Sequence, residues 1–141
     1  MLSVVALLMM VAGLVGLFSR HALLSSARPV VLLQLVAIVT LIWARLTFGF
    51  RSFHASATPT EGGLVTTGPY RYIRHPIYAS VCLFTWASSL GHLSAFSVAM
   101  ALLVSLGAAV RMAMEEALLR ERYPDYSAYA SRTKRIVPFL F

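Results

Sequence analysis

The chain has 141 residues, enough for one domain, and 59% of them are hydrophobic while only 12% are charged. A small soluble domain is usually about a quarter charged and has too little interior to bury so many apolar side chains. The composition therefore excludes an ordinary soluble domain and a disordered tail, and it indicates a membrane protein. A disulfide-built secreted module is also excluded, because Cys82 is the one cysteine.

The basic residues outnumber the acidic ones by 12 to 5, a formal charge of +7. Ten of the twelve follow residue 44 and lie within or beside apolar runs. Basic residues in this position are explained by the positive-inside rule, so we expect no nucleic-acid partner. The same rule predicts a polytopic integral membrane protein with both termini in the cytoplasm.

Apolar runs predict about four transmembrane helices, since a crossing needs about 20 apolar residues. The first run spans residues 1–18, and the second spans 30–50 behind Pro29, which suits a first helical turn. The third run, 77–90, is short for a full crossing and could instead be a re-entrant helix. A turn at 91–94 joins it to the fourth run, 95–110, and this predicts a helical hairpin.

Beyond Val110 the sequence stays rich in helix formers until Pro124, so the last helix should project from the membrane as a charged extension. The predicted fold is all-α. One integral membrane domain, 1–141, then consists of two N-terminal transmembrane helices (1–50), a cytoplasmic loop (51–76), a helical hairpin (77–110), and a cytoplasmic helix and tail (111–141).

The loop before the third run is the first segment that could carry chemistry. Between residues 61 and 78 it has three glycines, two prolines and three tyrosines, together with Arg71, Arg74 and His75. Exposed backbone, cations and aromatic rings could hold an anionic molecule that contains an aromatic group. The alternative is an aromatic and basic belt at the membrane interface. His75 precedes Pro76 and is a natural N-cap, and no second histidine lies at metal-ligand spacing, so we expect no metal site.

The adjacent carboxylates Glu115 and Glu116 are the second such segment. At a spacing of four residues, Glu116 can pair with Arg120 on the helix surface and Glu115 with Arg111. One reading is that a carboxylate holds a cationic ligand at the membrane boundary. The other is that the neighbouring arginines simply solvate the pair.

Four motifs occur in a fixed order along the last 81 residues. They are the run Leu64-Val65-Thr66-Thr67-Gly68-Pro69-Tyr70-Arg71-Tyr72-Ile73-Arg74-His75-Pro76-Ile77-Tyr78, the run Glu115-Glu116-Ala117-Leu118-Leu119 after an apolar hairpin, Tyr123-Pro124-Asp125-Tyr126, and the terminal Arg135-Ile136-Val137-Pro138. In this order they resemble the isoprenylcysteine carboxyl methyltransferase family, whose wider relatives include the phospholipid N-methyltransferases. The chain departs from that pattern at Gly62-Gly63, where the family often has a histidine, and at Ser80, where it has a glycine.

The resemblance implies a membrane enzyme that binds S-adenosylmethionine at a cytoplasmic loop and methylates a lipid-like acceptor entering from the bilayer. By the same resemblance, two groups of residues would border the cofactor. From the loop they are Leu64, Val65, Tyr70, Arg74, His75 and Tyr78, and from the last helix they are the carboxylates Glu115 and Glu116.

The acceptor decides which residues would be catalytic. An isoprenylcysteine-like carboxylate is already ionised at neutral pH and needs only a cation to hold it, for which Arg45, Arg74 and Arg111 are candidates. A phospholipid amine needs a group that takes its proton, and His75 or Glu115 would serve. The sequence leaves both acceptors open, together with the oligomeric state.

Two further functions remain open from the sequence. Membrane sterol reductases, which use NADPH, contain a similar Arg-His-Pro-x-Tyr segment but are generally much longer. A non-catalytic membrane protein would use its basic end only for orientation and contact with anionic lipid. In that case His75→Ala and Glu115→Gln would leave function unchanged.

Overall fold

The computed structural model describes residues 1–49 and 63–137, which form five α-helices and one short 3-10 helix. The elements are α1 (Leu2–Ser19), α2 (Arg28–Phe48), the 3-10 helix η2 (Gly68–Arg71), α3 (Pro76–Gly91), α4 (Ala95–Arg122) and α5 (Tyr126–Arg132). In these two ranges extended pairing is limited to an isolated parallel bridge between Ile73 and Lys134. The predicted all-α class is confirmed.

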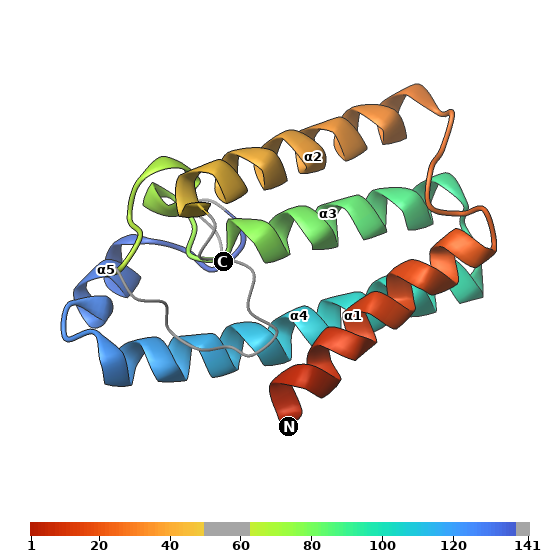
Figure 1. Ribbon diagram of the computed structural model, residues 1–141. Coiled ribbons are helices and arrows are strands. Elements are labelled where there is room, and N and C mark those ends of the chain that lie inside the picture. Colours follow the sequence, from red (N-terminus) through yellow and green to blue (C-terminus); the bar gives the residue numbers. More distant parts are fainter. Residues whose placement is uncertain (50–62, 138–141) are drawn as a thin grey trace.

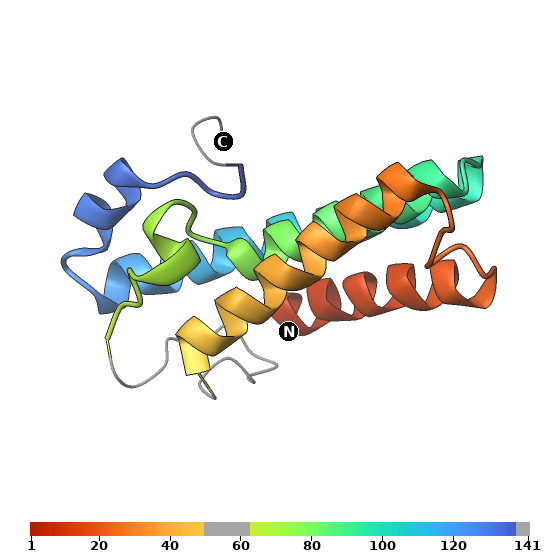
Figure 2. The same ribbon diagram turned by 90° about the horizontal axis from the view of Figure 1, so that it is seen from above.

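The four long helices lie antiparallel to their neighbours in a flat bundle (Figure 1). α1 packs along α4, α2 packs along α3, and α3 packs against α4. The connections 20–27 and 92–94 meet at one end, where His92 Nε2 lies 2.7 Å from the Leu24 carbonyl. At the other end, η2 and α5 approach each other while α4 runs on past the start of α1 (Figures 1 and 2).

Local sequence signals set the helix boundaries. Pro29 occupies the first turn of α2, and Pro76 opens α3. Ser94 and Ser97 form a reciprocal capping box at the start of α4. That helix then continues without a break to Arg122 and ends before Pro124, as predicted from the sequence. Residues 51–62 of the predicted loop 51–76, like residue 50 at the predicted end of the second run, lie outside the described residues.

In the described part of the chain, α1, α2 and α4 are long and apolar enough to cross a membrane. α3 has 16 residues and so measures about 24 Å, less than the roughly 30 Å of a hydrocarbon core. Three of the four predicted transmembrane helices therefore have the length and composition that a membrane crossing requires. The crossing by α3 and the orientation of the bundle stay predictions.

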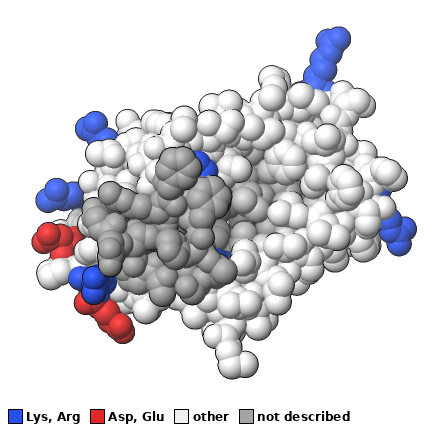
Figure 3. Space-filling view, in the orientation of Figure 1, with Lys and Arg blue, Asp and Glu red and all other residues white. Residues whose placement is uncertain are grey.

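The outer surface is more apolar than the contact surface between helices. Large side chains such as Leu8, Leu32 and Leu106 are more than half exposed, while Ala101 and Ala108 are fully buried. On the face seen in Figure 3, most of the visible charged side chains lie toward the two ends, with a wide uncharged surface between them. Small residues inside and large apolar residues outside are the arrangement of helices that pack in lipid.

Glycines let α1 and α4 approach closely. A Cβ at Gly107 would lie 2.6 Å from the Ala6 carbonyl oxygen, and one at Gly13 would lie 2.9 Å from the Met100 carbonyl oxygen. Backbone atoms cannot move aside as a flexible side chain can. The α1–α4 contact therefore depends on the absence of a side chain at these two positions.

We expect Gly107→Val to destabilise the bundle by about 1–3 kcal/mol, because the added methyl groups overpack the contact between α1 and α4. The midpoint of thermal unfolding in detergent measures this. Ala109→Val, at an exposed position on the same helix, is the matched control and should unfold like the parent protein. Equal midpoints for the two variants would show that α1 does not pack on α4 at this glycine.

Candidate functional site

The two segments that the sequence singled out meet at one end of the bundle. Arg74 and His75 come from the turn before α3, Tyr78 from its first turn, and Glu115 and Glu116 from α4. Direct polar contacts join the two groups. The two residues of each contact are about 40 positions apart in the sequence, and the α3–α4 hairpin brings them together.

Backbone conformation brings the turn close to α2. Gly68 has a positive φ of 57°, and a Cβ there would lie 2.5 Å from Thr47 Oγ1 on α2. Pro69 lies in the first turn of η2, and the ring centroids of Tyr70 and Phe48 are 5.5 Å apart. Glycine is therefore required at position 68 for both its conformation and its close approach.

Glu116 is the centre of a cluster of cations. Its side chain is 1% exposed, and its Oε1 lies 3.1 Å from Arg74 Nε and 3.2 Å from His75 Nε2. Its Oε2 lies 3.2 Å from Arg120 and from Arg135. The predicted pair with Arg120 exists, but the expectation of a surface arrangement is wrong. Three further partners from outside α4, namely Arg74, His75 and Arg135, cover the carboxylate, and periodicity along one helix cannot reveal them.

His75 lies between the two carboxylates. Its Nδ1 is 3.8 Å from Glu115 Oε2, and its Nε2 bonds Glu116. The residue occupies the predicted N-cap position of α3, but its side chain makes no capping hydrogen bond. The buried ring is used instead to connect α3 with α4.

Glu115 is the more open of the two acids, with a side chain 26% exposed. Tyr78 donates a hydrogen bond to it, and Arg111 Nη2 lies 3.5 Å away. Arg111 Nε also donates to the Tyr78 hydroxyl at 2.8 Å, and Nη1 donates to the carbonyl and hydroxyl oxygens of Ser3 at 3.2 Å. The first turn of α1 thereby supports the site, and no sequence signal pointed to Ser3.

The segment that follows α5 also borders the site, next to the turn before α3 and to α4. The amides of Arg74 and His75 donate to the carbonyls of Lys134 and Arg135, and the Lys134 amide donates to the Tyr72 carbonyl. Arg74 Nη1 donates to the carbonyls of Ala130 and Thr133. Arg135 belongs to the terminal motif of the sequence, but that motif alone did not indicate that it reaches Glu116. Pro138 lies outside the described residues.

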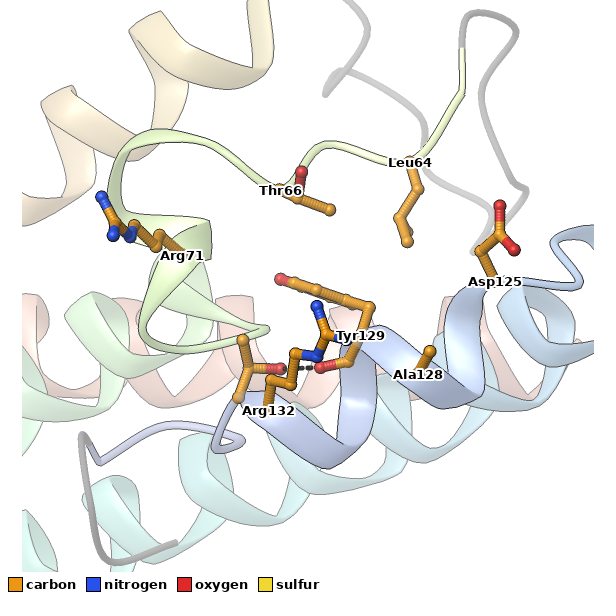
Figure 4. Close-up of a pocket in the computed structure, with 8 residues that line it drawn as sticks. Leu64, Thr66, Arg71, Asp125, Ala128, Tyr129 and Arg132 are labelled. Carbon is orange, nitrogen blue, oxygen red and sulfur yellow. Dashed lines mark hydrogen bonds between the residues drawn. The ribbon is translucent and has the colours of Figure 1, made fainter.

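An open pocket of about 610 Å³ lies between the loop before η2 and α5 (Figure 4). Its lining combines apolar, aromatic and charged groups, namely Leu64, Thr66, Arg71, Asp125, Ala128, Tyr129, Arg132 and Thr133. The Tyr129 ring extends toward Thr66 (Figure 4). The volume lies within the range of small-molecule sites. Thr133 links this pocket to the Glu116 cluster, because its carbonyl accepts from Arg74.

The remaining predicted site residues lie at different places. Leu64 lines the pocket, whereas Val65 is half-buried and is not part of its lining. Tyr70 is buried beside α2, and Arg45 in the last turn of α2 acts electrostatically on its phenol. In residues 1–49 and 63–137, no group of three or more His, Cys, Asp or Glu is arranged to hold a metal ion.

Tyr129 fastens α5 to the turn before α3. Its hydroxyl donates to the Tyr70 carbonyl at 2.7 Å. Burial raises the pKa of the Tyr70 and Tyr129 phenols, so both stay protonated at neutral pH. The Tyr129 hydroxyl therefore remains a donor under all ordinary conditions.

We expect Tyr129→Phe to destabilise the protein by about 0.5–1.5 kcal/mol, because it removes one neutral hydrogen bond and leaves the Tyr70 carbonyl without this donor. Thermal unfolding in detergent measures the change. Tyr72→Phe, at a residue 50% exposed, is the control. A loss of stability no larger than that of the control would contradict a role for this bond.

Two comparisons, with family models and with curated proteins, each gave a match, and the comparison with solved structures gave none. The model of a family described as phospholipid methyltransferase matches residues 27–126. The nickel-cobalt-cadmium resistance protein NccN of Alcaligenes xylosoxydans xylosoxydans is 37% identical over 81 residues, which cover 55% of this chain and 37% of that protein. The chain thus spans little more than a third of the length of this relative. No solved structure matches.

The family match takes in 100 of the 141 residues, counted from 27 to 126. It includes the turn with Arg74 and His75 as well as Glu115 and Glu116, and it agrees with the resemblance read from the sequence motifs. The chain belongs to the phospholipid methyltransferase family.

Proposed function

We propose that the protein is an integral membrane methyltransferase that uses S-adenosylmethionine to methylate a lipophilic acceptor. One observation carries the proposal: the family match runs through the two segments that meet at Glu115 and His75. The basic residues at this end of the bundle favour a cytoplasmic site by the positive-inside rule. Membrane lipids then surround the helices, and the acceptor enters from the bilayer.

The residues present fit the chemical groups of the cofactor. Glu115, partly exposed beside Tyr78, suits the positive charges of the sulfonium and ammonium groups. Leu64 and Tyr129 in the adjoining pocket suit a nucleoside, and Asp125 there can accept from ribose hydroxyls. The oxygens of Glu116 are already taken up by three arginines and His75. Glu115 is therefore the carboxylate of the pair that we assign to ligand binding.

A carboxylate is the acceptor that the described residues serve best. The cofactor supplies an electrophilic methyl group, and the protein has to orient the acceptor and exclude water. Arg74 is committed to Glu116 and to two backbone carbonyls. Arg111 of α4 also bonds Tyr78 and Ser3, but it lies beside the partly exposed Glu115 rather than in the buried Glu116 cluster, so we assign it to hold the acceptor carboxylate, as in an isoprenylcysteine-like substrate.

A phospholipid amine is the second candidate, favoured by the description of the matching family. An ammonium group must lose a proton before it can accept a methyl group. His75 Nδ1 and Glu115 Oε2, 3.8 Å apart, are the groups that would take it. A carboxylate, which is already ionised at neutral pH, needs no such proton transfer, which is why we place the amine second.

Transfer of labelled methyl from S-adenosylmethionine tests the proposal. The purified protein is offered a prenylcysteine, a phosphatidylethanolamine and a small apolar carboxylic acid. Methylation of the prenylcysteine alone supports the carboxyl assignment, while methylation of the phospholipid alone overturns it and supports the amine. Calorimetry adds a second arm, because NADPH binding without S-adenosylmethionine binding would favour a reductase. Binding of neither cofactor by folded protein would favour a non-catalytic role.

A further inference from the structure

The segment that follows α5 is joined to the turn before α3 by backbone hydrogen bonds. Arg74 N lies 2.7 Å from the Lys134 carbonyl, His75 N lies 3.0 Å from the Arg135 carbonyl, and Lys134 N lies 3.2 Å from the Tyr72 carbonyl. Figure 2 shows this part of the chain beside the beginning of α3. Residues 134 and 135 are therefore held in a fixed register against the residue that precedes Pro76.

A side-chain contact connects the same segment to α4. Arg135 Nε lies 3.2 Å from Glu116 Oε1, and Arg135 Nη2 lies 3.2 Å from Glu116 Oε2. Two parallel bonds of this kind fix direction as well as distance, because the guanidinium is planar. Arg135 thus sets how the carboxylate of Glu116 is turned.

The carboxylate in turn fixes the imidazole of His75. An ionised carboxylate only accepts, so His75 Nε2, 3.2 Å from Glu116 Oε1, carries the hydrogen. Nδ1 is then the ring atom that faces Glu115, at 3.8 Å from its Oε2. At that separation a ligand nitrogen about 2.9 Å from each atom can donate to both.

We infer that Arg135 is a positioning residue: through Glu116 it holds the His75 ring so that Nδ1 and Glu115 together face the ligand. The terminal segment is by this inference a part of the site, and Glu116 acts by orienting His75 rather than by touching the cofactor. The inference rests on the proposed function for the identity of the ligand. The orientation of the ring can be measured without any ligand.

Arg135→Ala and Arg120→Ala form a matched pair of variants. Both arginines lie 3.2 Å from Glu116 Oε2, and both side chains are about half exposed, at 43% and 53%. Arg120 belongs to the same helix as Glu116, so its removal leaves the terminal segment attached to the turn. Arg135→Lys keeps the charge but cannot form the two parallel bonds, and it replaces Arg135→Ala if that variant does not fold.

Three readouts on the full-length protein in detergent test the inference. Hydrogen exchange of residues 72–76 and 133–137 reports the attachment of the segment. The ¹⁵N signal of the His75 ring, assigned by its loss in His75→Asn, reports which nitrogen carries the hydrogen. Calorimetry with S-adenosylmethionine reports affinity. For Arg135→Ala we expect faster exchange, a mixture of His75 tautomers and affinity lower by roughly fivefold to thirtyfold, with a smaller loss for Arg135→Lys.

Arg120→Ala should keep the Nε2-protonated ring and an affinity within about twofold of the parent protein, since one ion pair with a half-exposed partner contributes little. An unchanged tautomer in both arginine variants would overturn the inference. Equal losses of affinity in Arg120→Ala and Arg135→Ala would overturn it as well. If the parent protein does not bind S-adenosylmethionine, the proposed function fails, and the exchange and tautomer measurements still decide whether Arg135 positions His75.

Discussion

Replacement of Glu116 by glutamine should cost about 3–5 kcal/mol of unfolding free energy. The amide keeps the shape of the side chain but removes the charge that compensates Arg74, which is only 11% exposed. It also replaces one of the two carboxylate oxygens, which accept from His75 and Arg135, with an amide group that donates. Since about 3 °C of midpoint corresponds to 1 kcal/mol in a chain near this size, thermal unfolding in detergent should shift down by roughly 10 °C.

Glu121→Gln is the control for this variant. Glu121 lies on the same helix, one residue beyond Arg120, and its side chain is exposed. Its neutralisation should change the midpoint by less than about 3 °C, because surface ion pairs contribute at most about 1 kcal/mol. A Glu116→Gln midpoint equal to that of Glu121→Gln would mean that the buried charge cluster does not hold the fold together.

Glu115→Gln should show the opposite pattern, with folding kept and ligand binding lost. The glutamine oxygen can still accept from Tyr78, and the ion pair with Arg111 is partly open to solvent. Arg111, which is 7% exposed, keeps its bonds to Tyr78 and Ser3, so the unfolding free energy should fall less than in Glu116→Gln. A hydrogen bond to a charged group contributes about 1.5–3 kcal/mol, so affinity for S-adenosylmethionine should fall by roughly tenfold to a hundredfold. Calorimetry measures the affinity, and labelled methyl transfer should fall with it.

Glu121→Gln again serves as the comparison, now for affinity, and should bind as the parent protein does. Parent-like affinity in Glu115→Gln would remove Glu115 from the ligand site. A large drop in its unfolding midpoint would instead assign Glu115 the structural role that we give to Glu116. The two neighbouring carboxylates are thus distinguished, because Glu116→Gln should change the unfolding midpoint and Glu115→Gln should change the ligand affinity.

The helices could be predicted because their signals are local. Apolar runs, Pro29, Pro76 and Pro124 gave the beginnings and ends to within a few residues. Pairs at a spacing of four residues, Arg111 with Glu115 and Glu116 with Arg120, were also predicted correctly. Whether α3 crosses a membrane was left open by its length, and at 16 residues it still is.

The contacts between distant segments could not be predicted in the same way. Arg135 reaches Glu116, and Arg111 reaches Ser3, across 19 and 108 positions of sequence. Helical periodicity says which residues share a face of one helix but not which other segment covers that face. For this reason the spacing of Glu116 and Arg120 predicts only a surface pair, and the resemblance assigns no role to Arg135.

The contact between Ser3 and Arg111 makes the depth of α1 in the bilayer relevant to the ligand site. Arg111 is bound at one side to the first turn of α1 and at the other to Tyr78 and Glu115. α1 has 18 residues, about 27 Å, which is close to the hydrocarbon thickness of a bilayer. A helix of that length adjusts to a thicker or thinner membrane chiefly by tilting. Since Ser3 lies in the first turn of this candidate span and bonds Arg111, we expect a change in its tilt, and so in lipid chain length, to alter the geometry of the proposed site.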